Sequence, residues 1–192
     1  MDIFEGARLY KLFPQHVVAS CMQRDIEPQE KLTVETAKLR EYNILDNESL
    51  SGIKSFVEEQ IALYVKNIIK PRNQSSLKLS TSWARHGNDD HTMFRVNSFI
   101  SGIFYLHADA DAVLQFNSDR QRDGLYIPTY APSDLNVNTC DIGLESGYLF
   151  LFPSRMAYRS LAGDGSLYIA FNTFPNGWLG DEGDADSYFL EE

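Results

Sequence analysis

The pattern of hydrophobic and polar positions divides the chain near residue 77. Before this point, one stretch has apolar residues at steps of three and four, as on one face of an α-helix: Leu50, Ile53, Val57, Ile61, Tyr64 and Ile68. Asp46 or Asn47 can cap its start, and Pro71 marks its end. The spacing predicts a helix over about residues 50–69, with its apolar face on the outer surface of a sheet.

Two weaker elements precede this helix. Residues 9–18 combine aromatic and β-branched side chains but contain Pro14, which favours a short strand at the edge of a sheet. Residues 30–42 are polar with irregularly spaced apolar positions, which predicts a short surface helix.

From residue 77 onward the apolar residues alternate or form short runs separated by turn sequences, as in LKLSTSW, LYIPTY (125–130), LFLFP and LYIAFNTF. The segment 96–116 organises this part. Its apolar run from Phe99 to Leu106 predicts a central strand. Asp109 and Asp111 then indicate a turn, and residues 112–116 are predicted to form a second strand that pairs antiparallel with the first. The whole pattern predicts a mainly β domain, an all-β sandwich or jelly roll with helices packed outside it.

The 192 residues contain neither a linker nor a change of composition, so we expect one domain over 1–192, with a helical region at about 28–70 and an acidic tail at about 177–192. The net charge of -10 disfavours nucleic acid and anionic membranes as ligands. No apolar window is long enough for a membrane span or an export signal, and Cys21 and Cys140 lack paired spacing. We therefore expect free, buried thiols and folding in the cytoplasm.

Several segments, taken in order, carry a resemblance to a known family: LFPQHVV, SLKLSTSWARHG, VNSFISGIFYL, AVLQFNSDR, SGYLFLFPSRMAYRS, LYIAFNTF and GWLGDE. They resemble a family of 2-oxoglutarate and iron(II)-dependent oxygenases common in marine bacteria and their phages. The resemblance implies a double-stranded β-helix, which agrees with the jelly roll predicted above.

The resemblance also implies where iron and cosubstrate ligands belong. Such a site needs two His and usually one carboxylate. The places of the first ligands hold Met93 and Arg95, the place of the last His holds Tyr158, and Ser166 replaces the basic residue that grips 2-oxoglutarate. The four His lie at positions 16, 86, 91 and 107, so none after His107 can complete a standard triad.

Arg95 strengthens this interpretation, because a permanently protonated guanidinium repels a nearby metal ion. Two other groups can in principle bind a divalent ion. His91 with Asp89 or Asp90 is one, although Gly87 and Asn88 equally indicate an ordinary polar turn. His107 with Asp109 spells His-x-Asp at the end of a strand, a match that chance often produces.

We therefore expect a pseudoenzyme: a jelly roll of oxygenase ancestry without cofactors, working as a structural or binding protein in a bacteriophage particle, cytoplasmic when made and then part of the virion. Its partners are expected to be phage structural proteins or further copies of itself. The alternative is an active dioxygenase that uses iron(II) and 2-oxoglutarate at an atypical metal site. Carbohydrate binding through surface aromatics is a third reading.

The C-terminal segment carries apolar residues among its acids, namely Trp178, Tyr188, Phe189 and Leu190. Large apolar groups near a chain terminus are costly to leave in water, and aromatic anchors are typical of interfaces. These residues are a candidate interface. Folding back onto the sheet is the equally weighted alternative.

Overall fold

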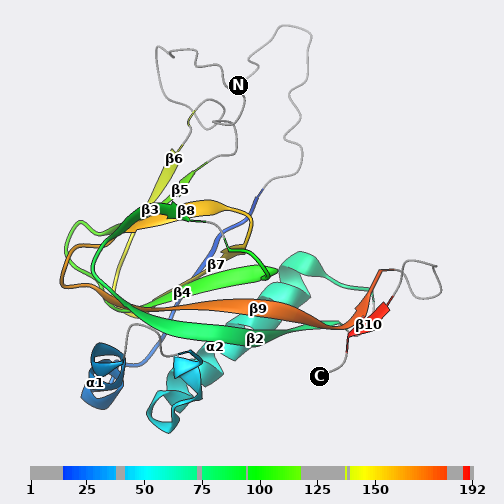
Figure 1. The fold of residues 1–192 in the computed structure, drawn as a ribbon, viewed down its shortest axis with the longest axis horizontal. Coiled ribbons are helices and arrows are strands. Elements are labelled where there is room, and N and C mark those ends of the chain that lie inside the picture. Colours follow the sequence, from blue (N-terminus) through cyan, green and yellow to red (C-terminus); the bar gives the residue numbers. More distant parts are fainter. Residues whose placement is uncertain are drawn as a thin grey trace, which may run out of the picture.

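The computed structural model describes residues 15–37, 42–72, 75–93, 95–117, 137, 139–180 and 188–190 (Figure 1). Its helices are α1 (Pro28–Thr36), the 3-10 turns η1 (Ile44–Asp46) and η2 (Glu48–Leu50), α2 (Ser51–Tyr64) and the π-helical turn η3 (Val65–Ile69). Its strands are β1 (Val18–Cys21), β2 (Ser76–His86), β3 (Asp89–Met93), β4 (Ile100–His107), β5 (Val113–Asn117), β6 (Thr139–Gly143), β7 (Tyr148–Pro153), β8 (Ala157–Leu161), β9 (Leu167–Leu179) and β10 (Tyr188–Leu190).

These strands form two antiparallel sheets. The larger has the order β1-β7-β4-β9-β10, with β2 also paired to β9, and the smaller has the order β3-β8-β5-β6. From β2 to β9 the chain therefore passes repeatedly from one sheet to the other. This is the strand order of a jelly roll, or double-stranded β-helix, and the predicted fold class is confirmed.

Helix α2 covers the outer face of the larger sheet (Figure 1), as the spacing predicted. Asn47 accepts a hydrogen bond from the Ser49 amide at 3.0 Å in the turn that leads into the helix. Of the six predicted apolar positions, five are buried (Leu50, Ile53, Val57, Ile61 and Tyr64), whereas Ile68 is 40% exposed in η3. The predicted helix is confirmed in place and in the face that it buries.

The predicted pairing of the central hairpin is wrong. Strand β4 is central and buried as expected, but it pairs with β7 and β9, and β5 belongs to the smaller sheet with β6 and β8. Because both edges of β4 already have partners, the chain after His107 crosses to the other sheet. The turn was placed correctly: Asp111 has a φ of +63°, and the Ala112 amide donates to the Asp109 carbonyl at 3.3 Å.

The N-terminal elements lie close to their predicted places. Among the described strands, β1 pairs with β7 alone and lies at the edge of its sheet, the position predicted for residues 9–18. It shares only Val18 with that range, however, and residues 1–14 lie outside the described part. Helix α1 begins two residues earlier than expected. Pro28 at its first turn and a capping box between Glu27 and Glu30 explain that start.

The predicted burial of the two thiols is wrong. Cys21 and Cys140 are both free, but both are exposed. Cys21 ends β1, and Cys140 lies in β6, which pairs with β5 alone among the described strands; side chains on such edge strands readily face solvent. Within the described residues no helix is long and apolar enough to cross a membrane. The predicted strand at 125–130 and most of the acidic tail lie outside the described part.

Candidate functional site

Three of the four residues at the implied ligand places come together between the ends of β3 and β8. Met93, the last residue of β3, is the register partner of Tyr158 in β8. Arg95 follows two residues later, and its guanidinium donates a short hydrogen bond to the Tyr158 hydroxyl. The Arg95 amide also donates to the Ser154 carbonyl at 2.9 Å, which fixes the backbone from which the guanidinium reaches.

Two aromatic rings flank the Arg95 guanidinium. Its central carbon lies 4.5 Å from the ring centre of Trp83 and 5.5 Å from that of Tyr158. At these distances the negative faces of the rings attract the cation. The charge that repels a metal ion is thus held in place by packing as well as by the hydrogen bond.

Tyr158 belongs to an aromatic cluster that fills the space between the sheets. It is 1% exposed, and its ring centre lies 5.0 Å from Phe152 and 6.5 Å from Phe116. Phe116 and Phe152 are themselves 5.0 Å apart, and edge-to-face contacts predominate. The ring occupies part of the sheet interior where the resemblance expects a metal ligand.

The hydroxyls in this interior stay protonated at neutral pH. Burial raises the pKa of Tyr158, and the nearby Arg95 and its hydrogen bond lower it without cancelling the effect. Burial likewise raises the pKa of Tyr105 and of Tyr168, whose rings are 5.1 Å apart. The Tyr105 hydroxyl shares a hydrogen bond of 2.9 Å with Ser160. Tyr158 is therefore a neutral phenol and not a phenolate ready to ligate iron.

The described residues at this place do not fit iron(II). An iron ligand must offer a lone pair to the metal, but the Tyr158 hydroxyl accepts from Arg95, and the guanidinium has no lone pair to offer. The arrangement places a permanently charged guanidinium where the resemblance expects a metal ligand.

Ser166, the fourth residue, serves another contact. Its hydroxyl accepts from the Asp109 amide at 3.0 Å and donates a short hydrogen bond to the Ala162 carbonyl. It is 1% exposed and fastens the turn between β8 and β9 against the turn after β4. No contact described for Ser166 joins it to Arg95 or Tyr158.

The two alternative metal groups lie in and beside turns. Asp89 opens β3 opposite Ser160, while the side chains of Asp90 and His91 lie outside the described part, so that metal site stays a prediction. Asp109 lies 3.5 Å from His107 and accepts from the Gly165 amide at 3.0 Å. Among described residues, no group of three or more His, Cys, Asp or Glu is placed to hold a metal ion.

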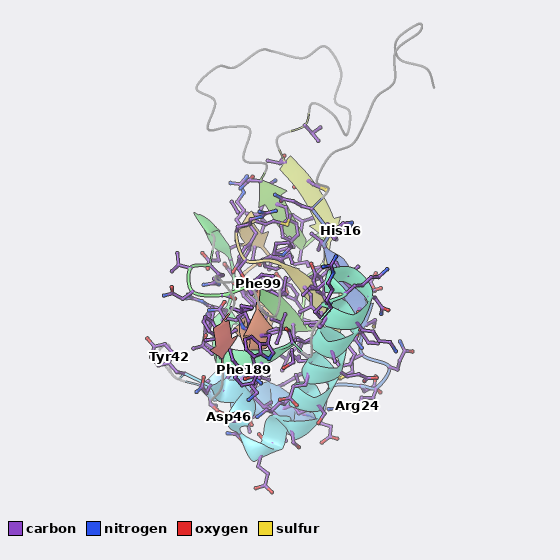
Figure 2. All side chains as sticks on the ribbon, turned by 90° about the vertical axis from the view of Figure 1, so that its right-hand side faces the viewer. His16, Arg24, Tyr42, Asp46, Phe99 and Phe189 are labelled. Atoms are coloured by element: carbon purple, nitrogen blue, oxygen red, sulfur yellow. The ribbon has the colours of Figure 1, made fainter. Side chains whose placement is uncertain are left out.

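The C-terminal segment folds back along β9. Strand β10 pairs with Gly177–Leu179, and the Phe189 ring lies edge-on to Trp178 with 5.4 Å between ring centres. Phe189 is nevertheless 52% exposed, and Leu190 is half-buried; the Tyr188 side chain lies outside the described part. Figure 2 shows Phe189 on the same side of the molecule as Phe99, another exposed ring. The segment is thus part of the sheet and still presents an apolar ring to solvent.

Sequence reasoning missed the ring that holds Arg95. Trp83 and Arg85 alternate with Ser82 and Ala84 in β2, so period two alone places them on one face. The contact between Trp83 and Arg95 depends on how the sheets stack, which no local pattern reports. The buried Trp83 Nε1 and Arg85 Nε have no hydrogen-bond partner among the described residues.

Comparisons with known proteins assign no family. No protein-family model matches the chain, and no curated protein matches it either. One solved structure that is similar to it is a prolyl-4-hydroxylase from Pseudomonas putida, at 12% identity and a TM-score of 0.41, over 82% of this chain and 92% of that chain. A likeness at that level carries no argument about activity, and the fold assignment rests on the strand order.

Proposed function

We propose that this chain is a non-catalytic jelly-roll protein of oxygenase ancestry that acts by binding other protein subunits. The observation that carries the proposal is the hydrogen bond from Arg95 to Tyr158, at the place where the resemblance expects iron ligands. The ancestry rests on that resemblance together with the double-stranded β-helix.

Converting this place into an iron site requires more than adding a ligand. The Arg95 guanidinium has to move away from the Trp83 ring, and the hydrogen bond that it donates to the Tyr158 hydroxyl has to break. Removing Arg95 leaves the buried Tyr158 hydroxyl without the donor described for it, which costs free energy. The interaction therefore stabilises the state without metal.

Iron content tests the proposal. The purified full chain is reconstituted with iron(II) and 2-oxoglutarate under anaerobic conditions, desalted and analysed for metal, and decarboxylation of 2-oxoglutarate is then followed in air. We expect much less than one iron per chain and no turnover. Stoichiometric iron with turnover would replace the proposal by the alternative of a working dioxygenase, and loss of both in Asp89→Asn would locate its site at the start of β3.

The binding role is proposed for the exposed end of the C-terminal segment. Phe189 keeps half of its surface in water beside Trp178, within a segment rich in acids, and such aromatic groups are typical anchors of interfaces. The proposed setting is a larger assembly such as a bacteriophage particle, in keeping with where the resembled family occurs.

A single substitution tests this surface. Phe189→Ser removes the ring but keeps the backbone pairs of β10, so the domain should stay folded and the tagged chain should lose its co-purifying subunits. Leu32→Ser is the matched control, since Leu32 is also an exposed apolar residue, at 50%, but lies on α1. Equal recovery of partner subunits with both variants would contradict the assignment.

A further inference from the structure

Residues 22–36, which we call the N-terminal strap, comprise the loop after β1 and helix α1. Within the strap, α1 packs against β2, β9 and η2. Two residues of α1 are buried, Glu30 and Val34, and only Val34 is apolar. Helix α2, which covers the same face of the larger sheet, buries four side chains, all of them aliphatic or aromatic. The attachment of α1 therefore depends less on hydrophobic burial than that of α2.

An ion pair between Arg24 and Glu30 ties the strap together internally. The guanidinium donates to the two carboxylate oxygens at 2.6 and 2.9 Å. The Glu27 amide donates to the same carboxylate at 2.8 Å, and Arg24 also donates to the Asp25 carbonyl at 2.9 Å. Glu30 is only 2% exposed, and a carboxylate so buried is costly unless it is paired and hydrogen-bonded. Because these donors all belong to the strap, the loop and α1 hold together as one unit.

The Arg24 guanidinium also lies against the first turn of α2, at Gly52. A Cβ atom at residue 52 would clash with Arg24 Nη2 and lie 3.3 Å from its Cζ. The guanidinium cannot move aside without breaking the hydrogen bonds to Glu30 and Asp25. Glycine is less favourable than alanine within a helix, and the contact with Arg24 is a physical reason for its presence here.

A depression of about 400 Å³ lies between the strap and the strands beneath it. It is lined by residues 22–26 and Lys31 on one side and by Leu106, Ser146 and Gly147 on the other. Two polar contacts link the strap to its surroundings: the Met22 amide donates to the Gly147 carbonyl at 3.0 Å, and the Thr33 and Ser49 hydroxyls share a hydrogen bond of 2.8 Å. A segment that packs so incompletely can open while the rest of the domain stays folded.

We propose that the strap opens and closes as a unit over the outer core, with the contact between Arg24 and Gly52 as its latch. Opening withdraws Val34 from the outer core and uncovers apolar surface of the larger sheet, while the pair of Arg24 with Glu30 stays formed within the strap. Opening costs less free energy than global unfolding, because Val34 is the one buried apolar side chain that α1 contributes.

Native-state hydrogen exchange of the full chain, followed residue by residue by NMR at increasing urea below the unfolding transition, tests the proposal. Amides of residues 31–36 should exchange through an opening that depends only weakly on urea, because little surface is exposed. The slowest amides of β4 and β9 should exchange through global unfolding. Exchange of residues 31–36 at the rate and urea dependence of β4 would overturn the proposal.

The variant Gly52→Ala tests the latch. It displaces Arg24 but places a better helix former in α2, so the strap and the domain should respond in opposite directions. Exchange at residues 31–36 should become about tenfold faster, as expected for the loss of one hydrogen bond, while the slowest amides of β4 and β9 should be unchanged or slower. Ser55→Ala, at an exposed position of the same helix, is the control and should leave the strap unchanged.

The same substitution in an Arg24→Ala background shows whether Arg24 is the group that is displaced. There, Gly52→Ala should no longer accelerate exchange of the strap, because the side chain that it displaces is absent. Unchanged strap exchange in Gly52→Ala alone, or equal acceleration in both backgrounds, would overturn the assignment of the latch. If the Arg24→Ala protein does not fold, the comparison of Gly52→Ala with Ser55→Ala still decides it.

Discussion

The two faces of the larger sheet differ in the chemistry of the side chains that they bury. Along β4, Phe104 and Leu106 face α2, whereas Ile103 and Tyr105 face the smaller sheet. The outer core is built from carbon side chains almost throughout, whereas the inner core holds three tyrosines, a guanidinium at its edge and buried hydroxyls. The outer face explains how the domain is held together. The polar groups of the inner face are the ones that bear on whether the space between the sheets can bind a metal ion.

The largest expected effect lies in the outer core. Ile61→Ala should lower the free energy of unfolding by about 2–5 kcal/mol, because Ile61 is 2% exposed and its loss leaves a cavity between α2 and the sheet. Chemical denaturation followed by circular dichroism measures it. Leu63→Ala, at an exposed position of the same helix, should change the free energy by less than about 0.5 kcal/mol. Equal effects of the two would mean that the helix does not bury the face described above.

High pH should destabilise the fold chiefly through the inner core, which buries three tyrosines, whereas the outer core buries only Tyr64 among the described residues, whose pKa burial also raises. Burial raises the folded-state pKa of Tyr105 and Tyr168 above that of a tyrosine in the unfolded chain, near 10. The folded protein then keeps protons that the unfolded chain releases. Stability is fully present below pH 10 and falls as the pH rises further, by about 1 kcal/mol for each buried tyrosine at pH 11.

The variant Tyr105→Phe sharpens that comparison. It should be less stable than the wild type at pH 8, because the buried Ser160 hydroxyl loses its hydrogen bond of 2.9 Å with Tyr105, and should lose less stability between pH 8 and pH 11. Urea midpoints at several pH values provide the measurement. An identical pH dependence in the two proteins would show that Tyr105 does not retain its proton in the fold.

A smaller effect is expected where the inner core reaches its edge. Tyr158→Phe removes the hydroxyl that accepts from Arg95 but keeps the ring, and should cost about 1 kcal/mol, since Arg95 is partly exposed and water can replace the lost acceptor. Tyr148→Phe, which removes a hydroxyl from a half-buried ring stacked on Phe150, is the control and should be close to neutral. A neutral Tyr158→Phe would show that the contact with Arg95 contributes nothing to stability.

The smallest expected effect is on metal binding. Tyr158→His supplies the missing imidazole, yet iron content should not rise, because Arg95 still places its charge there and at least one more ligand is absent. Metal analysis after anaerobic reconstitution measures this. Stoichiometric iron in the single variant would mean that the ligand places were assigned wrongly.

Local patterns predicted the outer face well and the inner face only in part. The three- and four-residue spacing of Ile53, Val57 and Ile61 reports burial directly, since a helix has one face to cover. The strands were also recognisable, but their partners were not: β5 follows β4 after a short turn and still joins the other sheet. Pairing depends on which strand edges are already occupied, and this information is spread over the whole chain.

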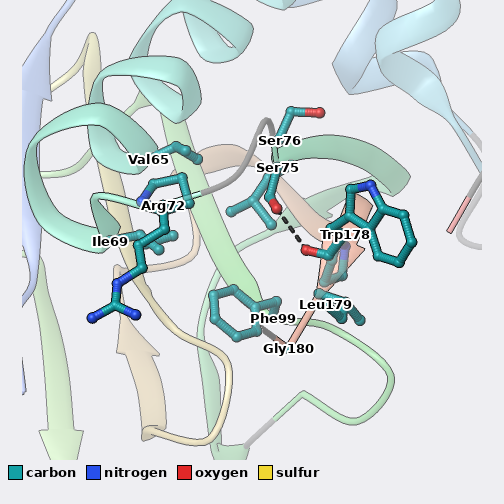
Figure 3. A pocket seen from close by; sticks show the side chains of 12 residues that line it. Val65, Ile69, Arg72, Ser75, Ser76, Phe99, Trp178, Leu179 and Gly180 are labelled. Carbon is teal, nitrogen blue, oxygen red and sulfur yellow. Dashed lines mark hydrogen bonds between the residues drawn. The ribbon is translucent and has the colours of Figure 1, made fainter. Parts of the chain in front are cut away.

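The candidate site shows the same limit. Met93, Arg95 and Tyr158 were singled out through resemblance, and the register of β3 and β8 brings their backbones together. The role of Trp83 beneath Arg95 was not predicted, because it depends on how the two sheets face one another. An apolar hollow that is lined by Phe99 and Trp178 (Figure 3) was missed for the same reason, since its walls come from four separate segments.

The measurement that tests the central claim most directly is an anaerobic calorimetric titration of the full wild-type chain with iron(II), followed by 2-oxoglutarate. The account predicts no saturable heat from either ligand at micromolar protein, because the Arg95 guanidinium already donates to the hydroxyl of Tyr158 and places a positive charge, with no lone pair to offer, at the implied ligand places. Micromolar binding of both ligands in a one-to-one ratio would contradict it.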